Sequence, residues 1–226
     1  MFKPEKLSSN QNDIFLAWFI VGCGGVGAMN LAKLAPSMGR LIDYFHITLF
    51  TSGLIGAIFS ALTLTTGLIG GVIISKYGPR LAMLLGLLIS LVGCLIPVLK
   101  PELAGLMIGR ALEGYGFLLI NLSAPVLLSL HTGSENRGRV MGIWGSFMPA
   151  GNAVIILIAP IIYLISDWHL LWVASAVYTA VICLFAVYII PPDPNQFKIA
   201  ITEKLSLVVR QTLKKTSLVV TGITFA

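Results

Sequence analysis

Residues 81–99 read LAMLLGLLISLVGCLIPVL and contain no charged side chain. A helix rises about 1.5 Å per residue, so a helix of this length crosses the hydrocarbon core of a bilayer, which is about 30 Å thick. Four further stretches without Asp, Glu, Lys or Arg are at least as long, namely 14–32, 47–75, 140–166 and 170–192. A sixth stretch, 103–130, is apolar except for Arg110 and Glu113. The sequence therefore predicts six transmembrane helices.

The composition of the whole chain of 226 residues agrees with this prediction. Apolar residues make up 57% and charged residues 11%, and the mean hydropathy is +0.93. Soluble globular domains carry about 25% charged residues, so a soluble or disordered chain is excluded. The apolar runs are continuous and do not alternate with polar residues as the strands of a membrane barrel do. We expect an all-α, polytopic membrane helix bundle with the lipid bilayer as its main partner.

The positive charges are placed as topology determinants. The 15 Lys and Arg residues exceed the nine acids, but they flank the apolar runs and form no basic groove with stacking aromatics, so no nucleic-acid partner is predicted. Eleven lie in the N-terminal arm, in the loops after the second and fourth spans and in the tail. The opposite loops hold Lys33, Arg40 and Lys100. The positive-inside rule then predicts that both termini are cytoplasmic. We expect a multi-pass protein of a bacterial plasma (inner) membrane.

The expected domain organisation follows from these spans. Residues 1–13 are a cytoplasmic arm, 14–192 the transmembrane bundle, and 193–215 a basic cytoplasmic connector. An interfacial helix is the alternative for the connector, because its apolar residues recur at helical spacing. Residues 216–226 are uncharged but too short to span, so we interpret them as the start of a truncated seventh helix.

Several short patterns are interpreted as packing features. Residues 20–23 resemble a lipoprotein cleavage box and residues 22–27 fit a dinucleotide-binding glycine pattern, but both lie within the first predicted span. Glycines four residues apart predict close helix approach at three places. These pairs are Gly67 and Gly71, Gly105 and Gly109, and Gly138 and Gly142. The three cysteines each lie in an apolar stretch and are expected to be packing residues.

The loop between the second and third spans, residues 71–80, reads GVIISKYGPR. Gly78 allows the positive φ of a tight reversal, and Pro79 suits the first position of the next helix. The loop resembles the signature loop of the major facilitator superfamily, whose pattern is glycine, any, apolar, small or apolar, acid, basic, any, glycine, basic, basic. The matching positions are Gly71, Lys76, Gly78 and Arg80. Ser75 replaces the acid that in the family helps to latch the two halves together, so the resemblance implies a conformational-switch loop without its usual acid.

A second motif lies in the fourth span, where residues 110–116 read RALEGYG. It resembles the fourth-helix motif of the same superfamily, with Glu113 at a position that is often glutamine. An arginine inside the membrane costs about 2.5–3.5 kcal/mol on insertion scales, so Arg110 needs a partner. Glu113 lies three residues further on the same helical face and can supply an ion pair.

The candidate site residues follow from this pair and from the resemblance. Phe117 and Asn121 continue the helical face of Arg110 and Glu113. In the family the first and fourth helices border a central cavity, which implies that Asn30 and Lys33 enter the same space. Two uses stay open for the charged pair, a purely structural one and a place in a substrate or proton pathway. Lys33 and Arg110 favour an anionic solute, whereas proton coupling through Glu113 is the alternative.

The resemblance covers about residues 10–192 and implies one six-helix half of a superfamily that has about twelve helices. The predicted function is secondary active transport of a small solute by alternating access, with this chain as the transporter or as its N-terminal half. The alternative is a truncated product or assembly partner without independent transport, which needs a C-terminal half or a second copy. An intramembrane enzyme is not predicted, because no serine and histidine have protease spacing. The sequence shows no metal or cofactor motif, and it does not identify the substrate or coupling ion.

Overall fold

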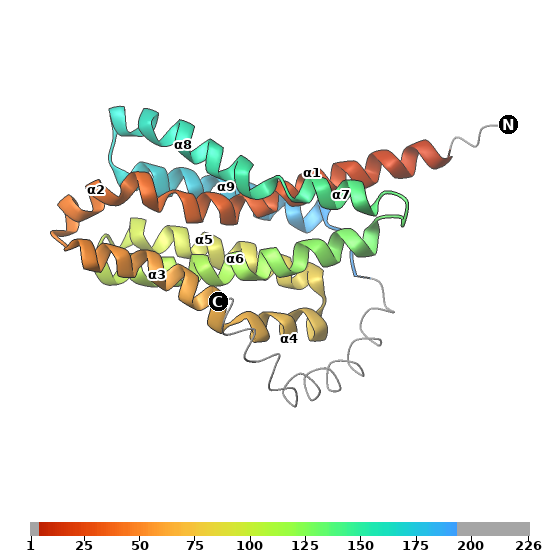
Figure 1. The fold of residues 1–226 in the computed structure, drawn as a ribbon, viewed down its shortest axis with the longest axis horizontal. Coiled ribbons are helices and arrows are strands. Elements are labelled where there is room, and N and C mark those ends of the chain that lie inside the picture. The colour runs from red at the N-terminus through yellow and green to blue at the C-terminus, as the bar shows by residue number, and fades with distance from the viewer. Residues whose placement is uncertain (1–4, 194–226) are drawn as a thin grey trace.

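The computed structural model describes residues 5–193, and over these residues α-helix is the regular secondary structure. The predicted seventh helix and all of the connector except Asp193 lie outside the described residues. The helices shown in Figure 1 are α1 (Glu5–Ala32), α2 (Leu34–Phe45), α3 (Leu49–Thr65), α4 (Gly67–Tyr77), α5 (Pro79–Leu99), α6 (Leu103–His131), α7 (Arg137–Trp144), α8 (Phe147–Ile165) and α9 (Trp168–Ile189). Helix α1 begins at Glu5, so it extends into the segment that was expected to be an arm.

These helices provide five candidate membrane spans, or six when one bent helix pair is counted as a span, and this all-helical membrane bundle confirms the predicted fold class. Five are long and apolar enough to cross a bilayer: Asp13–Phe45, Pro79–Leu99, Leu103–His131, Arg137–Ile165 and Trp168–Ile189. The sixth is the pair α3 and α4, which are bent by 52° where they meet. The second predicted span is therefore broken near its centre.

The first span differs from the prediction. It was expected to end at Ala32, with Lys33 and Arg40 in the following loop, but it continues through α2 to Phe45. Lys33 lies at the break between α1 and α2 with its side chain fully buried. The loop assignment of both cations is wrong, because Lys33 finds its partners in the interior and Arg40 finds its partners at the end of α8, which a count of charges along the chain does not show. Of the three residues assigned to the opposite loops, only Lys100 lies in a connection between spans. The orientation of the protein in the membrane stays a prediction.

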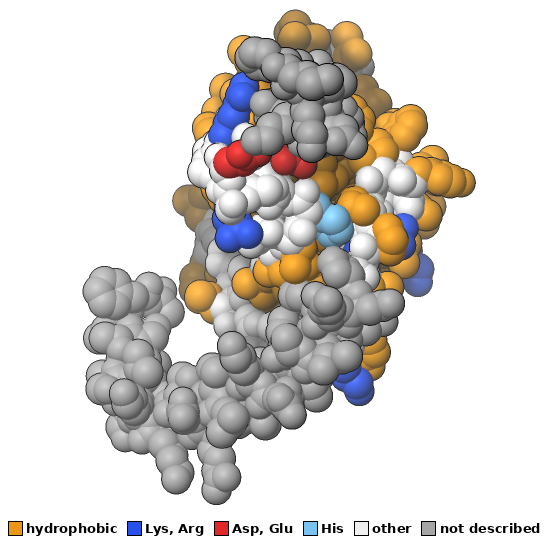
Figure 2. All heavy atoms as spheres, turned by 90° about the vertical axis from the view of Figure 1, so that its right-hand side faces the viewer, with side chains coloured by type: hydrophobic (Ala, Val, Ile, Leu, Met, Phe, Trp, Pro, Cys, Tyr) orange, Lys and Arg blue, Asp and Glu red, His pale blue; other side chains and the backbone are white. Residues whose placement is uncertain are grey.

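The spans are arranged around α1. This helix packs against α5, α6, α7, α8 and α9, and α5 and α6 form the most extensive helix pair (Figure 1). The loops that the charge pattern assigns to one side do lie at one end of the bundle. Figure 2 looks onto that end and shows Lys and Arg side chains among the apolar ones. The opposite end carries the α2–α3, α5–α6 and α8–α9 connections.

Glycines bring α5 and α6 into backbone contact. The predicted close approach at Gly105 and Gly109 is confirmed, because a Cβ on Gly105 would meet the Lys100 carbonyl oxygen just after α5 and one on Gly109 would lie 2.6 Å from the Gly93 oxygen. A Cβ added to Gly93 would lie 2.8 Å from the Gly109 carbonyl oxygen, and one on Gly116 would lie 2.6 Å from the oxygen of Gly86. The glycines are thus seven residues apart on each helix, a repeat that keeps one face against a long antiparallel neighbour. The pairs Gly67/Gly71 and Gly138/Gly142 face open space, so the prediction of close approach there is wrong.

Candidate functional site

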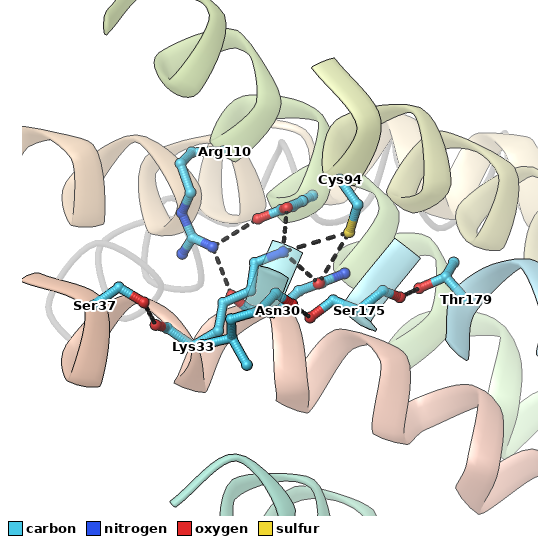
Figure 3. Close-up of polar contacts among 9 residues, drawn as sticks. Asn30, Lys33, Ser37, Cys94, Arg110, Ser175 and Thr179 are labelled. Atoms are coloured by element: carbon cyan, nitrogen blue, oxygen red, sulfur yellow. Dashed lines mark hydrogen bonds and ion pairs between the residues drawn. The ribbon is translucent and has the colours of Figure 1, made fainter. Parts of the chain in front are cut away.

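Four polar side chains meet inside the bundle. Two come from neighbouring turns of the first span, and two come from neighbouring turns of α6. Asn30 lies near the end of α1 and Lys33 at the break that follows it, while Arg110 and Glu113 come from α6. Figure 3 labels Asn30, Lys33 and Arg110. All four residues are 0% exposed. We call them the charged cluster. Their burial is complete within this chain alone, so they lie in the interior of the six-span unit and not on its outer wall.

Glu113 bridges the two cations of the charged cluster. The Lys33 Nζ atom lies 2.6 Å from Oε1 of Glu113, and Nη1 of Arg110 lies 2.6 Å from Oε2. Nη1 also donates to the backbone carbonyl of Asn30 at 2.5 Å. The predicted pairing of Arg110 with Glu113 is confirmed. A carboxylate held by two cations in a low-dielectric interior is expected to bind them strongly.

The ammonium group of Lys33 is fully coordinated. Its three donors reach Glu113, the Asn30 Oδ1 atom at 2.9 Å and the Cys94 Sγ atom at 3.4 Å. Figure 3 shows these side chains pointing toward one another. Nζ also lies 4.6 Å from the centre of the Trp172 ring, a cation–π distance. An ammonium group has three donors, so Lys33 has none left for a ligand in this arrangement.

Other donors in the charged cluster, and one beside it on Trp172, have no acceptor among the described residues. These are Nε and Nη2 of Arg110, Nδ2 of Asn30 and Nε1 of Trp172. A buried donor without a partner costs about 1–3 kcal/mol. The formal charges of Lys33, Arg110 and Glu113 add up to one net positive charge. The cluster thus has an excess of both positive charge and donors, which is the complement of an anion.

Phe117 and Asn121, the other two predicted site residues, lie further along α6. The half-buried Phe117 ring packs against Phe59 at 5.5 Å between centroids and fills the space beside Gly27. The amide of Asn121 donates to the Phe117 carbonyl at 3.0 Å. Phe59 also lies 4.7 Å from Cζ of Arg110, so Phe117 borders the cluster through this ring. Asn121 is directed along its own helix.

Sequence reasoning missed three residues that shape the cluster. Cys94 was interpreted as a packing residue, and Phe59 and Trp172 belong to no motif. Cys94 accepts from Lys33 and donates to Asn30 Oδ1 at 3.2 Å. Nothing local marks these positions, because each meets the cluster from a different helix.

The loop at residues 71–80, which we call the switch loop, has the predicted backbone at Gly78 and Pro79. Gly78 has φ 93° and Pro79 is the first residue of α5, which confirms both expectations. Ser75, at the position of the family's acid, is buried and donates to the Val72 carbonyl of its own helix at 2.9 Å. Lys76 lies in the last turn of α4 with Nζ 5.2 Å from the centre of the Tyr77 ring. A Cβ at Gly71 would meet open space.

An acid from another part of the chain lies at this loop. Both carboxylate oxygens of Asp193 are 3.2 Å from the backbone nitrogen of Arg80, in the first turn of α5. A carboxylate there caps free N–H groups and complements the helix dipole. The Arg80 side chain donates to the Val187 carbonyl of α9 at 2.8 Å. The end of the sixth span is therefore tied to the switch loop, a contact that the sequence did not predict.

Comparisons with known proteins agree with this fold. A profile of the Major Facilitator Superfamily matches residues 15–226. An uncharacterized transporter of Buchnera aphidicola subsp. Schizaphis graminum is 29% identical over 147 residues, which are 65% of this chain and 37% of that protein. A probable nitrate transporter, NarT of Staphylococcus epidermidis, is 30% identical over 155 residues, 66% of this chain and 39% of that protein. The chain thus spans less than half the length of these two relatives.

Among solved structures, the proton:xylose symporter XylE bound to 6-bromo-6-deoxy-D-glucose superposes with a TM-score of 0.75 at 11% identity. The superposition covers 84% of this chain and 46% of XylE. At this identity it shows the fold alone.

Proposed function

Because the chain belongs to the Major Facilitator Superfamily, we propose that it is one six-helix half of a secondary active transporter that carries a small anionic solute by alternating access. Its relatives are multi-pass membrane transporters. The observation that supports an anionic solute is the charged cluster, with one net positive charge and unpartnered Arg110 donors in a fully buried place.

Alternating access needs a second unit against which this one can move. The superfamily has about twelve helices in two pseudo-symmetric halves. The described residues of this chain hold five or six candidate spans, and the chain covers 37% and 39% of two relatives. We infer that a C-terminal half or a second copy completes the transporter. The alternative, an assembly partner without transport of its own, predicts solute binding without uptake. The bacterial inner membrane and cytoplasmic termini remain part of this proposal.

The names of the relatives do not decide the solute, since one names nitrate and another xylose. The charged cluster does discriminate between these classes. At an effective dielectric constant of about 20, an anion 4 Å from a cation gains about 4 kcal/mol, which a neutral sugar does not. The Nε and Nη2 atoms of Arg110 form one edge of a planar group, and that edge suits bidentate oxyanions such as nitrate or a carboxylate.

The rival interpretation is a structural ion cluster that never meets solute. Its complete burial favours this interpretation, and the unpartnered donors favour solute binding, because a finished structural cluster would satisfy them. In our proposal the described arrangement is closed, and solute reaches Arg110 only when the helices covering it separate.

Ligand-dependent thermal unfolding of the purified chain in detergent tests the proposal. Nitrate, formate, chloride and xylose are added at equal concentration, with ionic strength held constant. We expect nitrate and formate to raise the unfolding temperature more than chloride, and the increase to disappear in Arg110→Lys. Arg137→Lys, at the exposed first residue of α7, is the matched control and should respond like wild type. Stabilisation by xylose alone, or an equal response of both variants, would contradict an anion site at Arg110.

Proton coupling through Glu113 is a second candidate, favoured by its position between both cations. A protonated Glu113 would hold Lys33 and Arg110 less tightly, and this links proton binding to opening of the cluster. Uptake into proteoliposomes driven by a pH gradient should be lost in Glu113→Gln, while solute exchange without a gradient persists. Unchanged gradient-driven uptake in the variant would remove the coupling role.

A further inference from the structure

Helix α2 is the least embedded part of the first span. It buries only Leu34, Ser37 and Leu41. Pro36 has no N–H group to donate in the first turn, and Gly39 lowers the intrinsic stability of the helix. A short segment with few buried side chains opens at lower free energy than the core around it. Specific contacts must therefore hold α2 in place.

Those contacts run from α2 to the end of α8. Arg40 donates to the Tyr163 carbonyl at 2.8 Å and to the Ser166 carbonyl at 3.3 Å, and its Nη1 lies 3.2 Å from the Asp167 carboxylate. Its guanidinium carbon lies 4.4 Å from the centre of the Tyr163 ring. Carbonyls in the last turn of a helix have no helical partner, and a cation there is favoured. Arg40 thus caps α8 from α2.

Ser37 links this contact to the charged cluster. Its hydroxyl donates to the Lys33 carbonyl at 2.5 Å, and the Tyr163 hydroxyl lies 2.5 Å from it. Lys33 is the residue at which α1 ends and α2 begins. The backbone of the break is therefore tied, through Ser37 and Tyr163, to the same helix end that Arg40 caps.

An apolar plug separates the charged cluster from the end of the bundle. It contains Leu34 and Leu41 of α2 with Leu106, Trp168 and Trp172. Trp172 contacts Lys33 on the inner side of the plug. On the outer side, Trp168 borders a hollow of about 550 Å³ that is also lined by Arg40, Asp43, Tyr44 and Asp167. Movement of α2 away from α8 would remove two plug residues and connect the hollow with the cluster.

We propose that α2 is a gate over the charged cluster, which hinges at Lys33 and is held closed by the contacts of Ser37 and Arg40 with the end of α8. The role of this gate, control of solute access to the charged cluster, rests on the proposed transport function. Its opening, however, is a property of the protein without solute and is measured separately. Arg40 and Tyr163 are positioning residues in this proposal, because neither touches the cluster side chains directly.

Cys94 is a built-in reporter for the gate. It is 0% exposed and contacts Lys33, whereas Cys23 is 0% exposed in a separate part of the core. The full chain in detergent is treated with N-ethylmaleimide, and the modification of each cysteine is followed by peptide mass spectrometry. We expect the rate at Cys94 to rise on the order of tenfold in Arg40→Gln, because several charge-assisted hydrogen bonds that oppose opening are lost. The rate at Cys23 should stay unchanged.

Two further variants separate gating from general loosening. Tyr163→Phe keeps the ring but removes the hydroxyl that meets Ser37, and it should raise Cys94 modification several-fold. Asp43→Asn changes the charge beside the same hollow without altering the contacts of α2 with α8, and it should behave like wild type. An unchanged Cys94 rate in Arg40→Gln overturns the proposal, and so does a parallel rise at Cys94 and Cys23. Failure of anion binding in the wild type would instead count against the proposed function and leave this result intact.

Discussion

Cation–carboxylate contacts occur in two very different surroundings within residues 5–193. Glu113 is held by Lys33 and Arg110 at 2.6 Å each, and all three side chains are 0% exposed. Asp167 lies 3.2 Å from Arg40, and these side chains are 73% and 37% exposed. Water screens the second pair, and pairs of that kind contribute about 0–1 kcal/mol. Removal of one partner from a buried pair leaves an uncompensated charge and costs about 3–5 kcal/mol. Removing one partner from the same kind of ion pair should therefore cost much more stability when the pair is buried than when it is exposed.

The largest effect is expected from Glu113→Gln. This variant leaves Lys33 and Arg110 buried side by side without their shared carboxylate, so we expect a loss of stability of about 3–5 kcal/mol. Thermal unfolding in detergent measures it, with Asp167→Asn as the exposed counterpart. Similar unfolding temperatures for the two variants would show that the buried cluster does not hold the bundle together.

Lys33→Met tests the charge balance of the cluster. It leaves Arg110 paired with Glu113, so the net positive charge disappears while the carboxylate keeps one cation. We expect a smaller loss of stability than in Glu113→Gln, about 1–3 kcal/mol, because hydrogen bonds rather than the whole ionic bridge are lost. Stabilisation by nitrate should vanish. Retention of the full nitrate effect would place the anion away from this cluster.

Arg110→Lys keeps the charge and changes the geometry. A lysine cannot present the planar edge of Nε and Nη2, and it loses the reach to the Asn30 carbonyl, so about 1–2 kcal/mol of stability should be lost. The selectivity for nitrate over chloride should disappear in the ligand series. If the selectivity persists, charge alone and not bidentate geometry recognises the anion.

Asp167→Asn is expected to have the smallest effect, at most about 1 kcal/mol. The loss of stability caused by Asp167→Asn should become smaller when the salt concentration rises from 0.1 M to 1 M, because the screening length shortens from about 10 Å to about 3 Å. The deficit of Glu113→Gln should not respond to salt, since its charges are buried. A salt-sensitive Glu113 variant would indicate that water reaches the cluster.

Both contacts also show what the sequence could predict. Arg110 and Glu113 lie three residues apart on one helix, so their pairing followed from helical spacing, and it was confirmed. Lys33 and Arg40 were assigned to a loop because charges normally end a span, and this was wrong. Their partners, Glu113 and the end of α8, lie far away in the sequence. Asp193 at the switch loop escaped notice for the same reason.

The amino-acid sequence alone predicted the spans, their order and the alternation of their loops. This was possible because the hydropathy of a segment depends only on its own residues. The backbone of Gly78 and Pro79 was predictable on the same ground. Helix packing decided which charged side chains are buried. Glycines seven residues apart bring α5 against α6, and the packing of α1 on α6 brings Lys33 to Glu113. Burial and contact between distant residues arise only when helices meet, so the cluster, the burial of Lys33 at the helix break and the cap formed by Arg40 became visible in the folded bundle.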